Sequence, residues 1–487
     1  MRRASPPCLV GLVIACLWCL ALSELSTLGV ATPDGSSSGK DAGSGVTIQR
    51  FDPSALDAIL TAAVEVLVRD RLWTEGPLYW KDRNSLLFSD VRDNAIYSWT
   101  GDAKKKKDGG DDKEAAPATA TETATAVSGS LSELIRPSGW LSSSEAPRMW
   151  EPGSNGLALD KFGNLVAAQH GEPQIARVPL SELKEQQNGN KSVSFRSVAS
   201  RFQGRRFNSP NDLAFNPLNG DLWFTDPVYG LEKYGDDPKR ELNFQGVFRI
   251  PATAFRKAVV EKESEEEGRS NDTTGAADAA VTLEISSLSN PNGLAFSPDG
   301  STLFVSNSGK EASFWASFEI DGATGRVVKK KKQKVKTQNE NENINESNGT
   351  CSDPFPSSTS LSLEEEGGTK LWDVTAELQE ARKAGRTVGA SDGFKISEEG
   401  IVFASAIDSV FVFSPRFQKL LGKIVVGDKI GNVAFGGVDG NELFIAANSR
   451  ILRVKTKVKG SFFVRCFSFF SLFFFSFLSS FLSLLFF

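Results

Sequence analysis

Short alternating runs of apolar and polar residues, separated by turn residues, fill the chain from residue 63 onward. Residues 205–231 show this pattern clearly. An apolar run follows Asn211-Asp212, the chain turns at Asn219-Gly220, and a second apolar run covers 222–225. Asn-Gly between two such runs is a strong hairpin signal. Many short strands joined by tight turns predict an all-β fold of the sandwich, barrel or propeller type.

One unit recurs along the chain: a polar residue, an apolar strand, a turn that contains glycine, and a second strand. Six copies are present, and they begin at Glu75, Asn155, Asn211, Asn292, Asp392 and Asn432. Six such hairpin units predict a six-bladed β-propeller. A solenoid would need evenly spaced repeats, whereas these copies start about forty to about a hundred residues apart.

The uneven spacing comes from insertions of biased composition. We predict a propeller over residues 51–460, with disordered surface insertions at about 103–130, 257–280 and 327–368. These segments are rich in Lys, Glu, Asn, Ser or Thr and cannot bury an apolar face. Residues 24–50, rich in Gly, Ser and Thr, are predicted to be a linker.

Both ends of the chain are hydrophobic. Residues 1–23 have an Arg2-Arg3 start, an apolar run and a small-residue end, a pattern typical of a secretory signal peptide. Residues 461–487 form a hydrophobic low-complexity tail that is long enough to span a membrane. A tail anchor, a glycolipid-anchor signal and a mistaken C-terminus are the alternatives for this tail. We therefore expect a secreted protein, with membrane anchoring through the tail as the alternative.

Composition narrows the chemistry. Charged residues make up 24% of the chain and the net charge is −5, which argues against nucleic acid as the main partner. Loss of the signal peptide leaves only Cys351 and Cys466, so no disulfide framework is expected. A single histidine, His170, excludes a zinc site built from histidines. Four glycosylation sequons, at Asn190, Asn271, Asn345 and Asn348, fit a secreted glycoprotein.

The six residues that begin the repeats are all oxygen donors. In a propeller the first strand of each blade lines the central channel, so equivalent residues meet at one mouth of it. Hard cations such as Ca²⁺ bind carboxylate and carbonyl oxygens, and the two carboxylates, Glu75 and Asp392, would balance a divalent charge. The alternative is that Asn-Gly and Asp-Gly serve only as turn residues. His170, which follows the second copy, is either a substrate contact or a hydrogen-bonded structural residue.

Several motifs resemble those of the gluconolactonase, or senescence-marker-protein and luciferin-regenerating, family of six-bladed propellers. The resemblance covers about residues 50–460 without the insertions. Asn-Ser-Pro-Asn-Asp and Thr-Asp-Pro-x-Tyr-Gly-Leu resemble the microbial gluconolactonase branch in particular, whereas Ser391 stands where the family usually has proline. The matching pieces are residues 74–77, 154–160, 169–171, 206–212, 224–231, 291–300 and 391–393.

This resemblance implies a divalent metal, Ca²⁺ first, with Zn²⁺, Mn²⁺ or Mg²⁺ as alternatives. The family's metal ligands correspond to Glu75, Asn211, Asn292 and Asp392. Arg206 and Asn208 correspond to its substrate-side residues, and we add His170 and Asn155 as predicted substrate contacts. Asp392 corresponds to the catalytic residue that is taken as the general base. A metal-bound hydroxide is the competing nucleophile, because a carboxylate that binds a cation is a weak base.

The implied activity is metal-dependent hydrolysis of a sugar lactone to its aldonic acid. Two alternatives remain. One keeps the fold and the metal but acts on a phosphotriester or another ester. The other is a propeller without enzymatic activity that binds a partner on its face. No nucleic acid is expected as a partner, and a membrane only if the C-terminal tail anchors the protein.

Overall fold

Strands dominate the computed structural model of the protein, which describes residues 46–101, 127–140, 150–187, 193–264, 277–330 and 361–461. The predicted signal peptide, the four sequons, both remaining cysteines and the tail after Ser461 lie outside the described residues. These predictions stay predictions.

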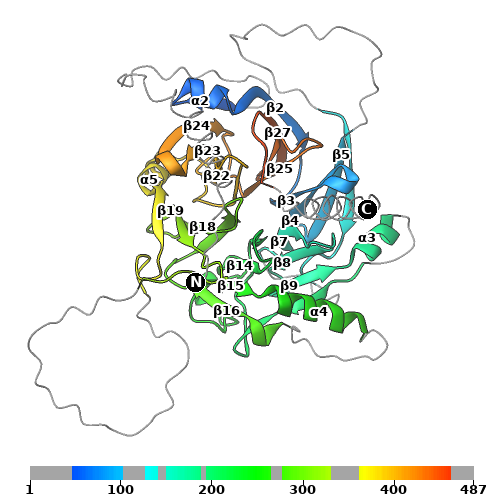
Figure 1. Cartoon of the computed structure of the whole chain (residues 1–487). Helices are drawn as coiled ribbons and strands as arrows, with labels where there is room; N and C mark the ends of the chain where they lie inside the picture. Colours follow the sequence, from blue (N-terminus) through cyan, green and yellow to red (C-terminus); the bar gives the residue numbers. More distant parts are fainter. Residues whose placement is uncertain are drawn as a thin grey trace, which may run out of the picture. The chain divides into compact units, whose positions relative to one another are not determined.

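The described strands form six sheets of at least four strands each, in the order of the repeats (Figure 1). Within each sheet the neighbouring strands are antiparallel, as hairpin repeats require. The first three sheets contain β3 (Thr74–Trp80), β4 (Ser85–Asp90), β5 (Ala95–Gly101) and β6 (Gly129–Ile135); β7 (Ser154–Leu159), β8 (Leu165–Gln169), β9 (Gln174–Val178) and β10 (Arg196–Ala199); and β13 (Leu213–Phe215), β14 (Leu222–Asp226), β15 (Gly246–Ile250) and β16 (Thr282–Ile285).

The last three sheets follow the same scheme and include the two N-terminal strands. They contain β17 (Pro291–Phe296), β18 (Thr302–Ser308), β19 (Ser313–Glu319) and β20 (Thr369–Asp373); β21 (Phe394–Ile396), β22 (Val402–Ala406), β23 (Ser409–Ser414), β24 (Lys419–Val425) and β1 (Thr47–Arg50); and β25 (Asn432–Gly436), β26 (Glu442–Ala447), β27 (Arg450–Thr456) and β2 (Leu60–Val68). We number these sheets as blades 1 to 6 in chain order of their inner strands.

The first strand of each blade contacts the first strand of the next, and the sixth returns to the first. The contacts run β3–β7–β13–β17–β21–β25–β3, a closed ring (Figure 1). The fold is therefore a six-bladed β-propeller, and this prediction is confirmed. Closure gives every sheet a neighbour on both faces, because each blade packs between two others.

The N-terminal strands complete the last two blades. β2 pairs antiparallel with β27, with Val64 opposite Val454 and Val66 opposite Leu452, so the start of the domain closes blade 6. β1 pairs with β24 at the outer edge of blade 5. The prediction of a linker over residues 24–50 is wrong for Thr47–Arg50, which forms strand β1. Composition alone assigned these residues to a flexible segment, but backbone pairing with an edge strand orders them.

Apolar side chains form six clusters, one at each junction between neighbouring blades. At the junction of blades 3 and 4, the fully buried Trp223 packs edge-on against Phe296, with ring centroids 5.9 Å apart. At the junction of blades 2 and 3, Phe224 and Phe248 stack at 5.5 Å. Burial of these large rings holds the blades together.

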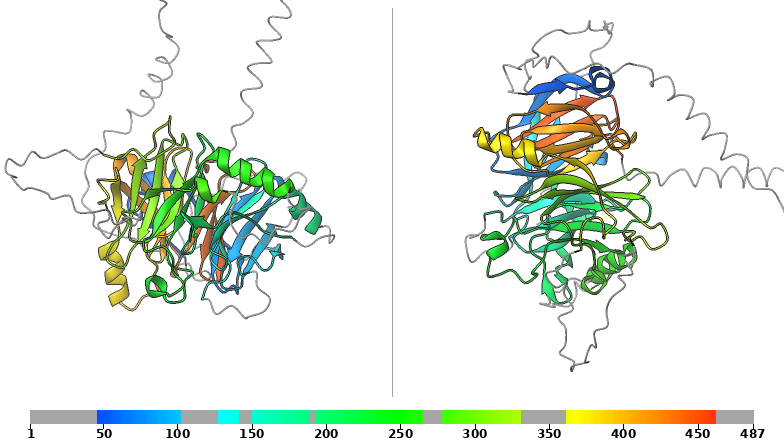
Figure 2. Two further views of the ribbon diagram at one scale, coloured as in Figure 1. Left: turned by 90° about the horizontal axis from the view of Figure 1, so that it is seen from below. Right: turned by 90° about the vertical axis from the view of Figure 1, so that its left-hand side faces the viewer.

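Helices lie on the outside of the propeller (Figure 2). They are α2 (Pro53–Asp57), α3 (Leu180–Gln187), α4 (Ala252–Ser264) and α5 (Thr375–Lys383). Phe255, Ala258 and Val259 of α4 pack into the cluster between blades 2 and 3, and Leu378 of α5 packs into the cluster between blades 4 and 5. Among the described residues, no helix combines the length and apolarity that a membrane span requires.

The insertions are shorter than predicted where their ends join strands or helices. Residues 129–130 begin β6, residues 257–264 continue α4, and Val327 bridges to Ile320. Glu366 is buried and accepts hydrogen bonds from the backbone N–H groups of Ser286 and Ser287. Composition placed these ends in loops, but pairing and packing with sequence-distant residues order them. The middle of each insertion lies outside the described residues.

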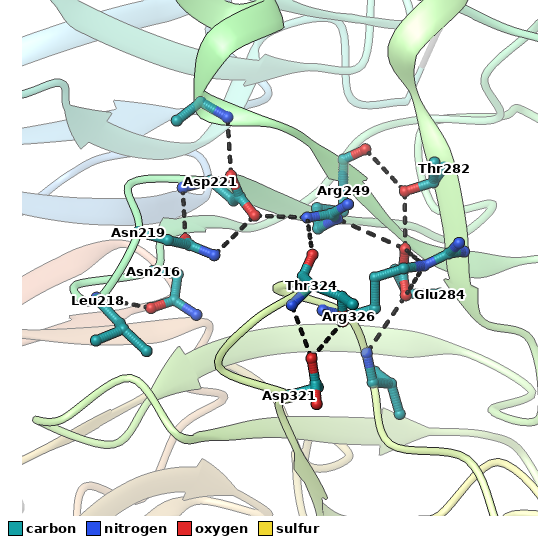
Figure 3. A network of polar contacts seen from close by, with 12 residues as sticks. Asn216, Leu218, Asn219, Asp221, Arg249, Thr282, Glu284, Asp321, Thr324 and Arg326 are labelled. Carbon is teal, nitrogen blue, oxygen red and sulfur yellow. Dashed lines mark hydrogen bonds and ion pairs between the residues drawn. The ribbon is translucent and has the colours of Figure 1, made fainter. Parts of the chain in front are cut away.

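A polar network joins blades 3 and 4 at the end where the inner strands finish (Figure 3). Arg249 donates to Asp221 at 2.6 Å and to the carbonyl of Thr324 at 3.3 Å. Glu284, 1% exposed, accepts from Thr282 at 2.8 Å and from Arg326 at 3.2 Å. The loop that follows β19 is thereby fastened to blade 3.

Candidate active site

The six residues that begin the repeats come together at the other end of the channel. Four of them are the first or second residue of an inner strand: Glu75 of β3, Asn155 of β7, Asn292 of β17 and Asn432 of β25. The other two, Asn211 and Asp392, lie two residues before β13 and β21. Asp392 is half-buried, and the other five are buried. A ring of inner strands brings equivalent positions to one place, which explains this convergence.

Side-chain amides link three of these residues from blade to blade. Asn155 donates its Nδ2 to Oδ1 of Asn211 at 2.9 Å, and Asn211 donates its Nδ2 to Oδ1 of Asn292 at 2.7 Å. Asn292 is in turn hydrogen-bonded to the carboxylate of Asp392. This series of hydrogen bonds fixes the orientation of the side-chain oxygen and nitrogen of each amide. Oδ1 of Asn155, at its start, is buried and has no partner among the described residues.

Glycines next to the ring residues provide room for the neighbouring blade. A Cβ on Gly76 would lie 2.1 Å from the carbonyl oxygen of Asn155, and a Cβ on Gly393 would lie 2.0 Å from Cγ of Asn432. The glycine that follows several ring residues was interpreted as turn chemistry. Its role in the structure is close approach between blades, since any side chain would occupy the position of the next ring residue.

Asp212 was not predicted as a site residue, although it lies at the centre of the ring. It stands where four of the other five repeats have glycine, and its carboxylate reaches residues of two other blades. It accepts hydrogen bonds from the backbone N–H groups of Leu213 at 2.9 Å and Leu294 at 3.3 Å. Nδ2 of Asn432, from the opposite blade, also donates to it at 3.3 Å. An aspartate in place of the glycine of four other repeats was the sequence feature that could have identified Asp212 as a site residue.

Negative charge accumulates in this mouth. Burial raises the pKa of Glu75 well above its ordinary value, and the charges of Asp392, Asp212 and Glu151 raise it further. Burial also raises the pKa of Asp392, with contributions from Asp212 and Glu151, against opposing hydrogen bonds from Gly393 and Asn292. Carboxylates crowded in this way favour either a bound proton or a bound cation.

Two further residues of the mouth were missed. Glu151 lies in the connection before β7, with Oε2 3.3 Å from Nδ1 of His170. Tyr229, from the connection after β14, is hydrogen-bonded to Ser308, Asn292 and Asn290, and burial raises its pKa, so its hydroxyl keeps its proton. Both lie in connections between strands, where the repeat gives no register, although Tyr229 falls within the Thr-Asp-Pro-Val-Tyr-Gly-Leu motif.

The predicted substrate-side residues differ in their surroundings. His170 is fully buried beside Glu151. Arg206, in the short ribbon formed by β11 (Arg201–Phe202) and β12 (Arg205–Arg206), is 47% exposed and forms an ion pair with Glu241. Asn208 is buried and donates to Asp226 at 3.1 Å and to the carbonyl of Phe244 at 2.9 Å. Arg206 and Asn208 thus anchor the 227–245 connection, and their contact with substrate remains a prediction.

An aromatic stack lies on the rim beside Glu151. The guanidinium of Arg92 sits 4.1 Å from the ring centroid of Trp150 and 5.3 Å from that of Trp73. Trp150 directly precedes Glu151 and is 58% exposed. Trp73 lies two residues before Glu75. The stack therefore borders the carboxylate cluster on the side of blades 1 and 2.

Comparison with known proteins identifies the family. The SMP-30/Gluconolactonase/LRE-like region matches residues 73–449. The chain belongs to this family. A gluconolactonase of Zymomonas mobilis is 30% identical over 419 residues, covering 85% of this chain and 87% of the relative. A lactonohydrolase of Aspergillus oryzae is 24% identical over 271 residues, or 55% of this chain and 48% of that protein.

A solved structure shares the fold. A gluconolactonase of Xanthomonas campestris is 21% identical to this SMP-30/Gluconolactonase/LRE-like chain, with a TM-score of 0.52. The alignment covers 88% of this chain and 99% of that structure. This likeness agrees with the six blades described above.

The residues of the ring fit a hard cation. The family chain offers two carboxylates, Glu75 and Asp392, beside the amide oxygens of Asn211 and Asn292, and oxygen donors of this kind suit Ca²⁺. The unpaired Oδ1 of Asn155 adds an acceptor. Among the described residues, no group of three or more His, Cys, Asp or Glu side chains is arranged to hold a metal ion. The predicted ligand set combines amide and carboxylate oxygens, which suit hard cations better than soft ones.

Proposed function

We propose that the protein is a metal-dependent lactonase that opens a sugar lactone to its aldonic acid. One observation carries the proposal. The six equivalent positions of the propeller put Glu75, Asp392 and an ordered chain of amides at one mouth, where burial and then neighbouring negative charge raise the pKa of both carboxylates. Membership of the SMP-30/Gluconolactonase/LRE-like family and the similarity to the Zymomonas mobilis gluconolactonase support it.

Four residues would hold the ion: Glu75, Asn211, Asn292 and Asp392. A divalent ion bound there, Ca²⁺ by preference, would polarise the lactone carbonyl and stabilise negative charge on its oxygen. The hydrogen bond from Asn211 to Asn292 holds both amides in place before substrate arrives. Such preorganisation avoids a reorganisation cost during the reaction.

Features of the rim support a sugar ring as the substrate. The buried Oδ1 of Asn155, which has no partner among the described residues, is able to accept a hydrogen bond from a sugar hydroxyl. The protonated hydroxyl of Tyr229 lies beside Asn292 and is available as a donor. The ring of Trp150, 58% exposed and in contact with the guanidinium of Arg92, adds an apolar surface on the rim. Pockets for small molecules commonly combine such surfaces with few, well-placed polar groups.

The test is hydrolysis of D-glucono-1,5-lactone by the full-length protein, followed with a pH indicator and corrected for spontaneous opening. We expect a rate that chelator abolishes and Ca²⁺ restores. Glu75→Gln should lose the metal-dependent rate, whereas Glu399→Gln, at an exposed turn between β21 and β22, should keep it. An unchanged rate after chelation, or in Glu75→Gln, would contradict the proposal.

A substrate panel separates the alternatives. Phosphotriesters and aryl esters, assayed beside the lactone, reveal a different leaving group if one of them gives the higher kcat/KM. A binding module without activity would turn over none of them with any metal. Secretion and glycosylation are also proposed: expression in a secretory host should release a protein whose mass falls on treatment with an N-glycosidase.

A further inference from the structure

Arg92 lies on the rim of the mouth, in the turn between β4 and β5, without an acidic partner. Its Cζ is 4.1 Å from the ring centroid of Trp150 and 5.3 Å from that of Trp73, so two indoles contact one guanidinium. The side chain makes no hydrogen bond or ion pair with another described residue, and its Nε is buried. A buried N–H group without an acceptor costs free energy. Arg249, by contrast, pairs with Asp221 at 2.6 Å.

Short backbone contacts hold the three side chains of this stack in place. A carboxylate oxygen of Asp90 accepts the backbone N–H of Trp73 at 2.9 Å, and the carbonyl of Trp73 accepts the N–H of Val91 at 3.0 Å. The carbonyl of Val91 in turn accepts the N–H of Gly153, three residues after Trp150, at 2.8 Å. Because the three segments are bound to one another, the guanidinium loses little further freedom when it binds a ligand.

The same contacts place the stack beside the ring of oxygen donors. Ser89, three residues before Arg92, donates its Oγ to the carbonyl of Asn155 at 2.8 Å. Trp73 lies two residues before Glu75. Two or three extended residues span at most about 11 Å. The guanidinium of Arg92, which contacts Trp73, is therefore within reach of a substituent on a lactone that occupies the mouth.

An arginine held between aromatic rings suits an anionic ligand. The rings contact the faces of a guanidinium, which leaves the N–H groups at its edge free to donate two parallel hydrogen bonds to a carboxylate or phosphate. The carboxylates of Glu75, Asp212 and Asp392 make the rest of the mouth acidic. They repel an anion, so an acidic substituent is favoured beside the cation on the rim.

We propose that Arg92 determines substrate specificity by binding an anionic group, carboxylate or phosphate, at the end of the sugar lactone remote from its carbonyl; the inference rests on the proposed lactonase function. The substrate class is then the acidic sugar lactones rather than the neutral ones. Trp73 and Trp150 hold the guanidinium in place. Arg92 takes no part in bond making or breaking, so its loss weakens the binding of acidic substrates and spares hydrolysis itself.

The experiment uses pairs of lactones that differ only at the remote carbon. D-Glucaro-1,4-lactone carries a carboxylate where D-glucono-1,4-lactone carries a hydroxymethyl group, and 6-phospho-D-glucono-1,5-lactone adds a phosphate to D-glucono-1,5-lactone. The full-length, metal-loaded protein should give a higher kcat/KM for the acidic member of at least one pair. The pair with the larger ratio identifies carboxylate or phosphate as the preferred group. A ratio of one or less in both pairs would overturn the proposal.

Arg92→Gln should lower kcat/KM for the preferred acidic lactone by about 10- to 100-fold, mainly through KM, because hydrogen bonds from a charged donor are lost. The neutral member of the pair should change by no more than about twofold. Arg92→Lys keeps the charge without the planar fork and should retain part of the preference. Equal losses on the acidic and the neutral lactone would indicate a structural role and reject the assignment.

Arg83→Gln is the matched control. Arg83 lies in the turn between β3 and β4, at the opposite end of blade 1, with its Cζ 4.6 Å from the ring centroid of Trp80. The substitution removes the same kind of arginine–tryptophan contact away from the mouth, so the ratio of acidic to neutral kcat/KM should stay at the wild-type value. A fall as large as that in Arg92→Gln would reduce the effect to overall charge and contradict a local subsite.

Trp150→Leu tests the stack itself. Loss of the aromatic contact should lower the ratio of acidic to neutral kcat/KM by about 2- to 5-fold. Phe162→Leu, in the turn between β7 and β8, removes another exposed ring that contacts a cation, Lys161 at 4.8 Å, and should leave the ratio unchanged. An unchanged ratio in Trp150→Leu would contradict the role given to the stack.

A binding measurement separates this inference from hydrolysis. D-Glucarate and D-gluconate, the ring-opened products of the first pair, are titrated into the metal-loaded protein by calorimetry, which needs no turnover. The wild type should bind D-glucarate more tightly, and Arg92→Gln should bind the two alike. Equal affinities in the wild type would count against a carboxylate subsite. If no lactone is hydrolysed, the proposed function fails, while this comparison still decides the role of Arg92.

Discussion

Asn432 of blade 6 donates a hydrogen bond of 3.3 Å to the carboxylate of Asp212 of blade 3, across the channel of the propeller. Asp212 also accepts backbone N–H groups from its own blade and from blade 4. One carboxylate therefore connects three blades at the point where the metal is proposed to bind.

Asp212→Ala is expected to reduce the free energy of unfolding by at least ~1–3 kcal/mol, since it leaves buried donors without an acceptor. The loss should appear as a lower urea midpoint with an unchanged slope. Asp439→Ala, in the exposed turn between β25 and β26, is the matched control and should stay within ~0.5 kcal/mol of wild type. Equal midpoints for the two variants would argue against the cross-channel role.

Gly393→Ala is expected to disturb the site itself. The added methyl group would lie 2.0 Å from Cγ of Asn432, so Asn432 must move, at a cost of about 1–3 kcal/mol. Lactonase activity and thermal unfolding are the measurements, and both should decline. Gly322→Ala, with no heavy atom within 4 Å of the new Cβ, should change neither. A fully active Gly393→Ala variant would show that the ring tolerates displacement of Asn432.

Glu284→Ala is expected to destabilise the junction between blades 3 and 4. Glu284 is 1% exposed and lies 3.6 Å from Arg249 and 3.2 Å from Arg326 (Figure 3). Removal of the buried acceptor costs about 1–3 kcal/mol, while Arg249 keeps its pair with Asp221 and Arg326 is half-exposed. Equilibrium unfolding measures it, with Glu319→Ala on the exposed end of β19 as control. Additive losses in Glu284→Ala/Arg326→Ala would contradict direct coupling.

Asp226 should make stability depend on pH. Burial raises its pKa to about 7, against opposing hydrogen bonds from Asn208 and Ser209, whereas an unfolded aspartate titrates near ~3.9. Between these values the folded state keeps a proton that the unfolded state has released. The free energy of unfolding therefore falls as pH rises from ~4 to ~7, by up to ~1.4 kcal/mol per pH unit.

Urea unfolding across this pH range is the measurement. Asp226→Asn removes one titrating group and should reduce the decline, whereas Glu75 and Asp392, whose pKa values are also raised, keep part of it. Asp439→Asn should keep the wild-type slope. If Asp226→Asn shows the same slope as wild type, another group is responsible for the pH dependence.

Much of the fold was predictable because the repeat consists of local sequence patterns. Alternating strands and glycine turns gave six units, and equivalence of the units gave six residues at one mouth. The ends of the insertions and Thr47–Arg50 were not predictable, because β1 and Glu366 are ordered by partners far away in sequence. Glu151 and Tyr229 were missed for the same reason: they come from connections that have no register.

The sequence by itself determined the blade number, the ring of oxygen donors and the family motifs, since each depends on short-range pattern and spacing. Only the tertiary structure decided how the ring is linked. Closure by β2, the amide chain from Asn155 to Asn292, and the meeting of Glu151 with His170 all depend on which strands become neighbours. Packing between blades brings these side chains within hydrogen-bonding or ion-pair distance, and no local pattern specifies those distances.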